Sequence, residues 1–190
     1  MNGKNKEAIR VLGIGGSLRK GSYSMAVLRA AGRLLPDGAK FEVADLSGIP
    51  IFNQDNEPKP PQSVVKFKKQ IREADAILFC TPEYNYGIPG YLKNAIDWAS
   101  RPHSDNSFKD KPAAIISSSG GMFGGIKAQL QLREHFVYLD MHAVNDSIAV
   151  SNVEKKLDSD GELTDEYTIR RIKELPKELI EWTDRIAVER

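Results

Sequence analysis

Short runs of apolar residues alternate along the chain with longer segments whose apolar positions recur every three or four residues. The run at residues 9–15 is rich in isoleucine and ends in glycine, which predicts a buried strand. The run at residues 76–80 has almost no polar interruption, so we expect a strand that is covered on both faces. The expected strands span residues 9–15, 41–44, 76–80, 113–117 and 147–153.

The segments between these runs have the apolar spacing of amphipathic helices, which we expect at residues 22–35, 63–73, 89–100 and 125–139. A further helix is expected after Thr164, because threonine is a favoured residue at a helix N-cap. Pro176 is expected to kink or restart this helix, since proline removes a backbone donor and clashes with the preceding turn. Its apolar stripe consists of Ile169, Ile172, Leu175, Leu179 and Ile186.

Strands that alternate with helices are typical of an α/β protein, and right-handed crossovers then build an open, doubly wound parallel sheet of five strands with helices on both faces. We expect one such domain over residues 1–190. Ligands of these sheets bind beyond the carboxyl ends of the strands. The candidate binding loops are therefore residues 16–24, 81–88 and 118–125, which follow the first, third and fourth strands. The proline-rich segment 50–61 is a further candidate because of its length.

Charge and composition narrow the range of partners. The 190 residues carry 27 basic and 26 acidic side chains, a net charge of +1, so the basic excess typical of proteins that bind nucleic acid or anionic membranes is missing. The single cysteine, Cys80, cannot form an internal disulfide or a multi-thiolate metal site. The first residues lead into only a short apolar stretch, which predicts neither a signal peptide nor a membrane span. We therefore expect a cytoplasmic protein with small-molecule partners.

The loop after the first strand is suited to a phosphate monoester. Ser17, Ser22 and Ser24 offer hydroxyl groups at the amino end of an expected helix, where the helix dipole favours an anion. Arg19 adds a planar fork of donors. The alternative for these residues is simple capping of the helix.

Three familiar motifs do not match this loop. A P-loop needs a lysine after its second glycine, and Gly21 is followed by Ser22. A dinucleotide-binding fingerprint would need glycine in place of Leu18. A nucleophile elbow around Ser17 would need glycine in place of Arg19.

The other two loops offer a flat apolar surface and close access to the backbone. Tyr84, Tyr86 and Asn85 provide the ring faces and hydrogen bonds that a planar heteroaromatic ligand requires, but a rigid turn explains them equally well. Glu83 has no second carboxylate or histidine beside it in sequence, so we do not expect it to act as an acid. The serine- and glycine-rich segment 117–125 either admits a ligand close to its backbone or is a plain connector.

Three motifs together give the chain a family resemblance. They are GSLRKGSYS at residues 16–24, PEYNY at residues 82–86 and PGYLKNAIDWASRP at residues 89–102. In these residues the chain resembles the NADPH-dependent FMN reductase family, which includes bacterial chromate and quinone reductases, azoreductases and plant NAD(P)H:quinone reductases. The resemblance covers most of the chain, and the second and third motifs are long and specific.

The resemblance implies a flavodoxin-like fold that binds FMN and uses NADPH or NADH as electron donor. Four residues of the first motif would hold the FMN phosphate, namely Ser17, Arg19, Ser22 and Ser24, and Tyr23 would also belong to the cofactor site. The isoalloxazine ring would lie along the second motif, at Pro82, Glu83, Tyr84 and Asn85. The polar edge of the ring would approach the third loop, at Ser118, Ser119 and Gly120.

Two positions depart from the pattern of the family. Ser24 stands where most relatives have asparagine, which shortens one expected contact with the phosphate. Residues 130–133 read Leu-Gln-Leu-Arg where chromate reductases often read Tyr-His-Leu-Arg, in a region near their subunit contacts. The resemblance implies a homodimer or a homotetramer, and this departure bears on which of the two forms.

With FMN bound, the flavin carries the chemistry and no catalytic side chain is expected. The resemblance implies that hydride passes from NAD(P)H to the flavin N5 and that a flavin, quinone, azo compound or chromate then takes the electrons, with ping-pong kinetics. One alternative is a flavodoxin-like electron carrier without its own NAD(P)H turnover, which the net charge of +1 disfavours because such carriers are usually acidic. Another, a dehydrogenase that uses Asp45 to bind a ribose, lacks the glycine that Leu18 replaces.

Overall fold

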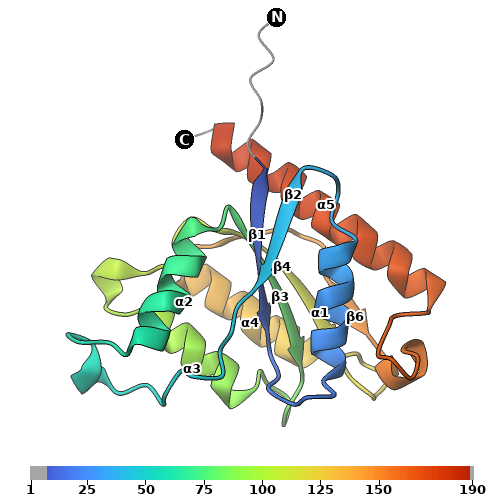
Figure 1. Ribbon diagram of the computed structural model, residues 1–190, viewed down its shortest axis with the longest axis horizontal. Helices are drawn as coiled ribbons and strands as arrows, with labels where there is room; N and C mark the ends of the chain where they lie inside the picture. Colours follow the sequence, from blue (N-terminus) through green and yellow to red (C-terminus); the bar gives the residue numbers. More distant parts are fainter. Residues whose placement is uncertain (1–7, 189–190) are drawn as a thin grey trace, which may run out of the picture.

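The computed structural model describes residues 8–188 and contains one β-sheet with helices on both faces (Figure 1). The strands are β1 (Ile9–Gly15), β2 (Ala39–Val43), β3 (Ala76–Pro82), β4 (Pro112–Ser118), β5 (His142–Ala143) and β6 (Ile148–Val150). The α-helices are α1 (Tyr23–Arg33), α2 (Gln62–Glu73), α3 (Gly90–Ala99), α4 (Ile126–Tyr138) and α5 (Glu166–Val188). Short 3-10 helices are η1 (Gln54–Asn56), η2 (His103–Asp105) and η3 (Val153–Lys156).

All strand pairs are parallel, and the strand order is β2-β1-β3-β4-β5, with β6 also paired to β4. This order is that of flavodoxin-like sheets and confirms the expected doubly wound arrangement. The fifth strand was expected at residues 147–153. The structure instead has two short strands, β5 before this range and β6 within it. Arg133 explains the interruption, because its guanidinium group donates to the carbonyl oxygens of Val144, Asn145 and Asp146.

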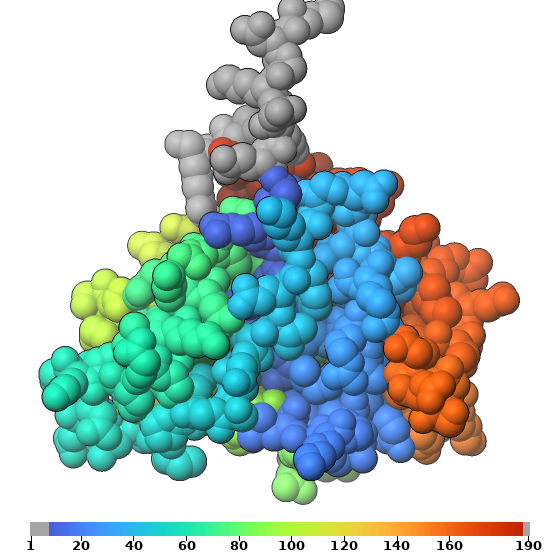
Figure 2. All heavy atoms as spheres, in the orientation of Figure 1, coloured from blue at the N-terminus to red at the C-terminus, as the bar shows by residue number. Residues whose placement is uncertain are grey.

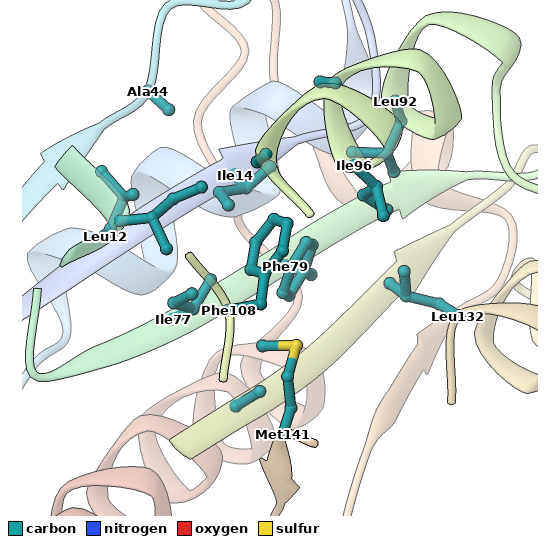
Figure 3. Close-up of a cluster of buried hydrophobic side chains, with 14 of the residues drawn as sticks. Leu12, Ile14, Ala44, Ile77, Phe79, Leu92, Ile96, Phe108, Leu132 and Met141 are labelled. Atoms are coloured by element: carbon teal, nitrogen blue, oxygen red, sulfur yellow. The ribbon is translucent and has the colours of Figure 1, made fainter. Parts of the chain in front are cut away.

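Each face of the sheet has its own apolar core because successive strand residues point to opposite sides. Leu12 and Ile77 pack with α2, α3 and α4, in the core that Figure 3 shows around Phe79. Val11 and Leu78, which are the sequence neighbours of Leu12 and Ile77, point to the other face and pack with α1 and α5. β3 is buried except at its last residue, which confirms that it is covered on both faces.

The expected N-cap of the last helix is wrong. The N-terminal amides of α5 are capped by Asp165, whose Oδ1 accepts from the Thr168 N–H at 2.9 Å, while Thr164 donates to the Lys156 carbonyl oxygen. The hydrogen bonds from Thr168 hold the pKa of Asp165 below its usual value. The helix is continuous through Pro176, so the proline does not restart it, and the kink stays a prediction. Its buried stripe runs on both sides of the proline, and this packing outweighs the roughly 3 kcal/mol that an interior proline costs.

The expectation about a signal peptide falls on residues 1–7, which lie outside the described residues. Within residues 8–188, the helices are all too short or too polar to cross a membrane.

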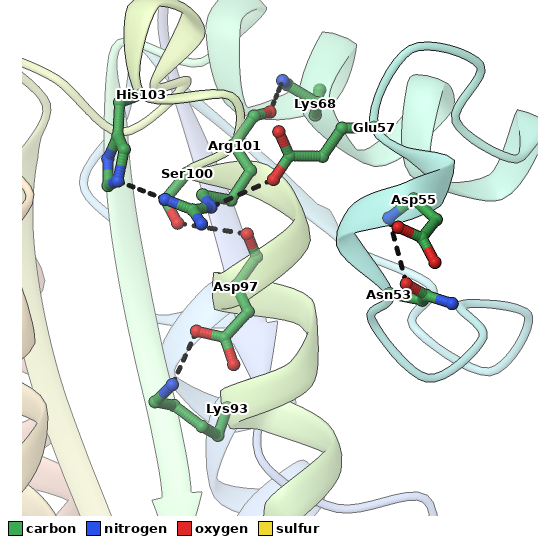
Figure 4. Close-up of polar contacts among 9 residues, drawn as sticks. All are labelled: Asn53, Asp55, Glu57, Lys68, Lys93, Asp97, Ser100, Arg101 and His103. Carbon is green, nitrogen blue, oxygen red and sulfur yellow. Dashed lines mark hydrogen bonds and ion pairs between the residues drawn. The ribbon is translucent and has the colours of Figure 1, made fainter.

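The proline-rich segment 50–61 is attached to α3 by side-chain hydrogen bonds. The side-chain nitrogens of Asn94 and Trp98 both donate to the Pro50 carbonyl oxygen at 2.8 Å. Further along, Arg101 Nε donates to Glu57 Oε1 at 3.1 Å, and the guanidinium group also contacts His103 (Figure 4). The polar residues of the third sequence motif therefore hold this loop in place.

Gly32 of α1 packs directly against the ring of Phe41 on β2, and a Cβ at this position would overlap the ring. We predict that Gly32→Ala lowers the free energy of unfolding by about 1–3 kcal/mol, the usual cost of overpacking. Gly90→Ala, in the first turn of α3, is the matched control because open space surrounds its added Cβ. Denaturant titration measures both variants, and equal stabilities would contradict the prediction.

Candidate functional site

A cavity of about 170 Å³ lies at the carboxyl edge of the sheet, between the loops that follow β1, β3 and β4. Its lining residues are Ser17, Arg19, Ser22, Tyr23, Ser24, Pro82, Glu83, Tyr84, Ser118, Ser119 and Gly120. Eleven of the twelve site residues expected from the sequence therefore meet around one cavity. Asn85 is the exception and lies at the exposed end of the second loop.

The first loop presents buried hydroxyl groups at the amino end of α1. Ser22 caps the helix, since its Oγ accepts from the Met25 N–H at 3.2 Å, and the same oxygen lies 3.0 Å from Oγ of Ser24. Ser17 is also buried, and the first turn of α1 contains no acidic residue. The capping alternative is therefore correct for Ser22, which also lines the cavity together with Ser17 and Ser24. The helix dipole and the first backbone amides favour an anion here.

Close packing joins the first loop to the second. The Gly16 N–H donates to the Cys80 carbonyl oxygen at 2.7 Å. A Cβ at Gly16 would lie 2.6 Å from Thr81 Oγ1 and 2.8 Å from the Pro82 ring, so only glycine allows this approach. In Figure 2 the blue atoms of the first loop and the light-green atoms of the second lie side by side at the lower edge of the molecule.

The second loop contains a tight two-residue turn. Tyr84 and Gly87 exchange backbone hydrogen bonds of 2.9 and 3.0 Å. Between them, Asn85 and Tyr86 have φ angles of +51° and +65°, as a type I′ turn requires. A tyrosine in this region is uncommon, and such backbone strain costs about 1–3 kcal/mol. The second loop is therefore a rigid turn, as one of the two interpretations predicted. The same turn also brings Tyr84 to the cavity.

The Glu83 side chain binds the amino end of α4, and this contact gives it a structural role. The N-cap of α4 is Gly125, which has no side chain to cap the helix. The Glu83 carboxylate supplies that function, because its Oε2 accepts from the backbone amides of Lys127 at 3.0 Å and Ala128 at 3.4 Å. A carboxylate at a helix amino end also interacts favourably with the helix dipole.

The third loop depends on a buried glutamine that the sequence did not single out. Gln129 Nε2 donates to Ser117 Oγ at 2.8 Å and to the Ile148 carbonyl oxygen at 2.6 Å. Ser117 in turn donates to the Gly124 carbonyl oxygen at 2.6 Å. Gly124 has a φ of +59°, and a Cβ there would lie 2.7 Å from the backbone of Ala149. The only sequence signal for Gln129 is a polar residue at a core-facing position of the helix.

Ser118 is the lining residue that points most directly to a ligand. It is only 2% exposed, and its Oγ has no hydrogen-bond partner among the described residues. A buried hydroxyl without a partner costs about 1–3 kcal/mol, so native proteins rarely keep one without a reason. A polar ligand in the cavity would satisfy it.

The Cys80 thiol and the Asp45 carboxylate have structural roles. Burial raises the pKa of the Cys80 thiol, so Cys80 stays protonated and unreactive. Asp45 accepts from the Ser47 N–H and Oγ at 3.0 and 2.7 Å, and these hydrogen bonds lower its pKa. Across residues 8–188, three or more metal-binding side chains do not come together at any point.

Comparisons with known proteins agree with this geometry. A family model described as NADPH-dependent FMN reductase matches residues 9–155. An NAD(P)H-dependent FMN reductase of Pseudomonas aeruginosa is 47% identical over 180 residues, which cover 94% of this chain and 97% of the relative. An NAD(P)H:quinone oxidoreductase of Solanum tuberosum is 47% identical over 173 residues, with coverage of 87% and 88%.

A solved structure gives the same assignment in three dimensions. The flavoenzyme NAD(P)H:(acceptor) oxidoreductase FerB from Paracoccus denitrificans matches with a TM-score of 0.83 at 32% identity. The match covers 93% of this chain and 98% of that one, so the similarity extends over both proteins.

Proposed function

This chain belongs to the NADPH-dependent FMN reductase family and is an FMN-dependent oxidoreductase of NAD(P)H, and we propose that the cavity at the carboxyl edge of its sheet holds the FMN. The observation that carries the proposal is that Ser118, whose buried hydroxyl has no partner among the described residues, lines the same cavity as the serines of the first loop. The donor set fits the ligand, since a phosphate accepts hydrogen bonds and a flavin edge both accepts and donates them.

The two ends of the cavity suit the two ends of this cofactor. Ser17, Ser22 and Ser24 lie where the dipole of α1 favours the phosphate, and Arg19 lies at the rim with its guanidinium group 4.8 Å from the Tyr23 ring centroid. Tyr84, which is 50% exposed, offers an apolar face for the ring system. At about 170 Å³ the cavity is smaller than most ligand pockets, so we propose that part of the cofactor extends along this exposed surface.

When bound, FMN supplies the hydride and electron chemistry, so the protein has to bind and orient rather than provide a nucleophile. We propose a quinone as the acceptor, in a reaction in which NAD(P)H and one proton reduce the quinone to a hydroquinone. The supporting features are the exposed aromatic surface of Tyr84 and Tyr86 and the quinone reductases among the relatives. Glu83 holds the turn that carries both rings.

The purified protein tests this function directly. We expect it to bind FMN and become yellow, to lose the colour with NADPH under anaerobic conditions, and to regain it when a quinone is added. Steady-state oxidation of NADPH with a quinone should give parallel double-reciprocal lines, as ping-pong kinetics require. Failure to bind added FMN would overturn the proposal, and bound FMN without NADPH turnover would favour an electron carrier.

Arg19→Gln is expected to weaken FMN binding about tenfold and riboflavin binding by less than about twofold, because a charge-assisted hydrogen bond is lost only to the phosphate. Lys20→Gln is the matched control, since it removes the same charge from a neighbouring exposed residue that does not line the cavity. Fluorescence titration measures both affinities. An equal loss for FMN and riboflavin would place the phosphate elsewhere.

Ser118→Ala is expected to leave the FMN-free protein at least as stable as the wild type, because it removes a hydroxyl that lacks a partner. The same change should weaken FMN binding about fivefold to tenfold, the effect of about 1 kcal/mol from one hydrogen bond. Ser107→Ala is the control, since Ser107 is also buried and unpartnered but does not line the cavity. Calorimetry gives both quantities. Unchanged FMN affinity in Ser118→Ala would contradict the assignment.

We further propose that residues 1–190 act as one FMN-binding domain, that the protein is cytoplasmic and that it forms a homodimer or a homotetramer. The exposed apolar residues Leu130, Val137 and Tyr138 on α4 support an assembly, because isolated surfaces rarely keep several large apolar side chains on one helix. Sedimentation analysis of the FMN-bound protein distinguishes the two oligomers, and a monomer would contradict both.

A further inference from the structure

The turn that brings Tyr84 to the cavity is attached to α4 at both of its ends. On the incoming side, the Glu83 carboxylate binds the first amides of α4. On the outgoing side, the Ile88 N–H donates to Oε1 of Gln131 at 2.7 Å. Residues 127 and 131 are one helical turn apart, about 6 Å along the axis, and share a face of α4. The two ends of the turn are therefore held at a spacing that the helix sets.

The contact with Gln131 is close as well as polar. A Cβ at Gly87 would lie 2.6 Å from Gln131 Oε1, so the backbone of the turn passes directly against this side chain. Ile88 is buried, so its amide needs a hydrogen-bond acceptor, although Gln131 itself is exposed. Gln131 provides that acceptor. Lys127, one helical turn before it, places Nζ 3.1 Å from the Tyr86 ring centroid.

Loss of the contact with Gln131 should allow the strained backbone of the turn to relax. Asn85 and Tyr86 both occupy the left-handed region of backbone conformation, which residues with a side chain avoid unless their surroundings enforce it. The hydrogen bonds inside the turn join only Tyr84 and Gly87. Contacts with α4 must therefore supply the remaining constraint.

We propose that Gln131 is a positioning residue, whose side-chain oxygen fixes residues 84–88 in the conformation that presents Tyr84 to the flavin ring. The inference rests on the proposed function for its ligand, but the constraint on the turn exists without FMN. Gln131 acts on the loop at the ring end of the cofactor, whereas Arg19 and the serines of the first loop act at its phosphate end. Its effect must therefore be the same for FMN and for riboflavin.

The test compares Gln131→Leu, Gln131→Glu and the control Glu134→Leu, an exposed position on the next turn of α4. Amide hydrogen exchange of Ile88, measured by NMR in FMN-free protein, should become at least about tenfold faster in Gln131→Leu, because the amide loses its acceptor. Affinities for FMN and riboflavin should both fall about fivefold to tenfold. Gln131→Glu keeps an acceptor oxygen and should restore all three values to within about threefold of the wild type. The control should leave them unchanged.

Each other result overturns a specific claim. Unchanged Ile88 exchange in Gln131→Leu overturns the positioning role, whether or not binding changes. Faster exchange with unchanged riboflavin affinity overturns the link to the ring. Wild-type protein that binds neither FMN nor riboflavin overturns the proposed function, while the exchange data still decide whether Gln131 holds the turn. If Gln131→Leu does not fold, Gln131→Ser removes the same acceptor with less apolar surface.

Discussion

The parallel pairing of β1, β3 and β4 is the constraint on which the site depends. Gly15 pairs with Cys80, and Pro82 pairs with Ser118, so the three strands end within a few residues of one another. Because parallel strands deliver their carboxyl ends to one edge, loops that are far apart in sequence must meet there. Burial of the strands on both faces holds this register, since a slip of one residue would exchange the two cores.

The sheet places the loops, but α4 determines their shapes. Glu83 and Gln131 connect the second loop to this helix, and Gln129 connects it to β4 and to the start of β6. The hydrogen bonds of Glu83 and Gln131 reach backbone amides and are exposed or partly buried, whereas those of Gln129, to Ser117 Oγ and to the Ile148 carbonyl oxygen, are buried. A satisfied buried network such as that of Gln129 specifies one conformation because every alternative leaves a polar group without a partner. The helix therefore couples the second and third loops, whereas the first loop depends on its own cap at Ser22.

The sequence predicted the parts of the molecule that follow from local pattern. The apolar runs located the strands of the core, the first two motifs located eight of the eleven cavity residues, and the loop after the fourth strand located the other three. The errors arose where long-range contacts override local preference. Arg133 divides the fifth strand through carbonyls about a dozen residues away, and the packing of α5 keeps the helix continuous through Pro176, where a restart was one of the two expected outcomes. Gln131 was equally hidden, because its partner Ile88 is 43 residues away and its segment departs from the family pattern.

The charges around the proposed FMN site are those of a binding site rather than of an acid–base pair. Among the lining residues only Arg19 and Glu83 carry a charge, and they occupy different loops. The Glu83 carboxylate lies at the amino end of α4, where it accepts from the Lys127 amide and interacts favourably with the helix dipole. Arg19 and the amino end of α1 then leave a net preference for an anion on the side of the first loop. In the proposed site this arrangement favours a phosphate beside the first loop and engages the one carboxylate with the backbone of α4, so the protein contributes binding and orientation while the cofactor contributes the chemistry.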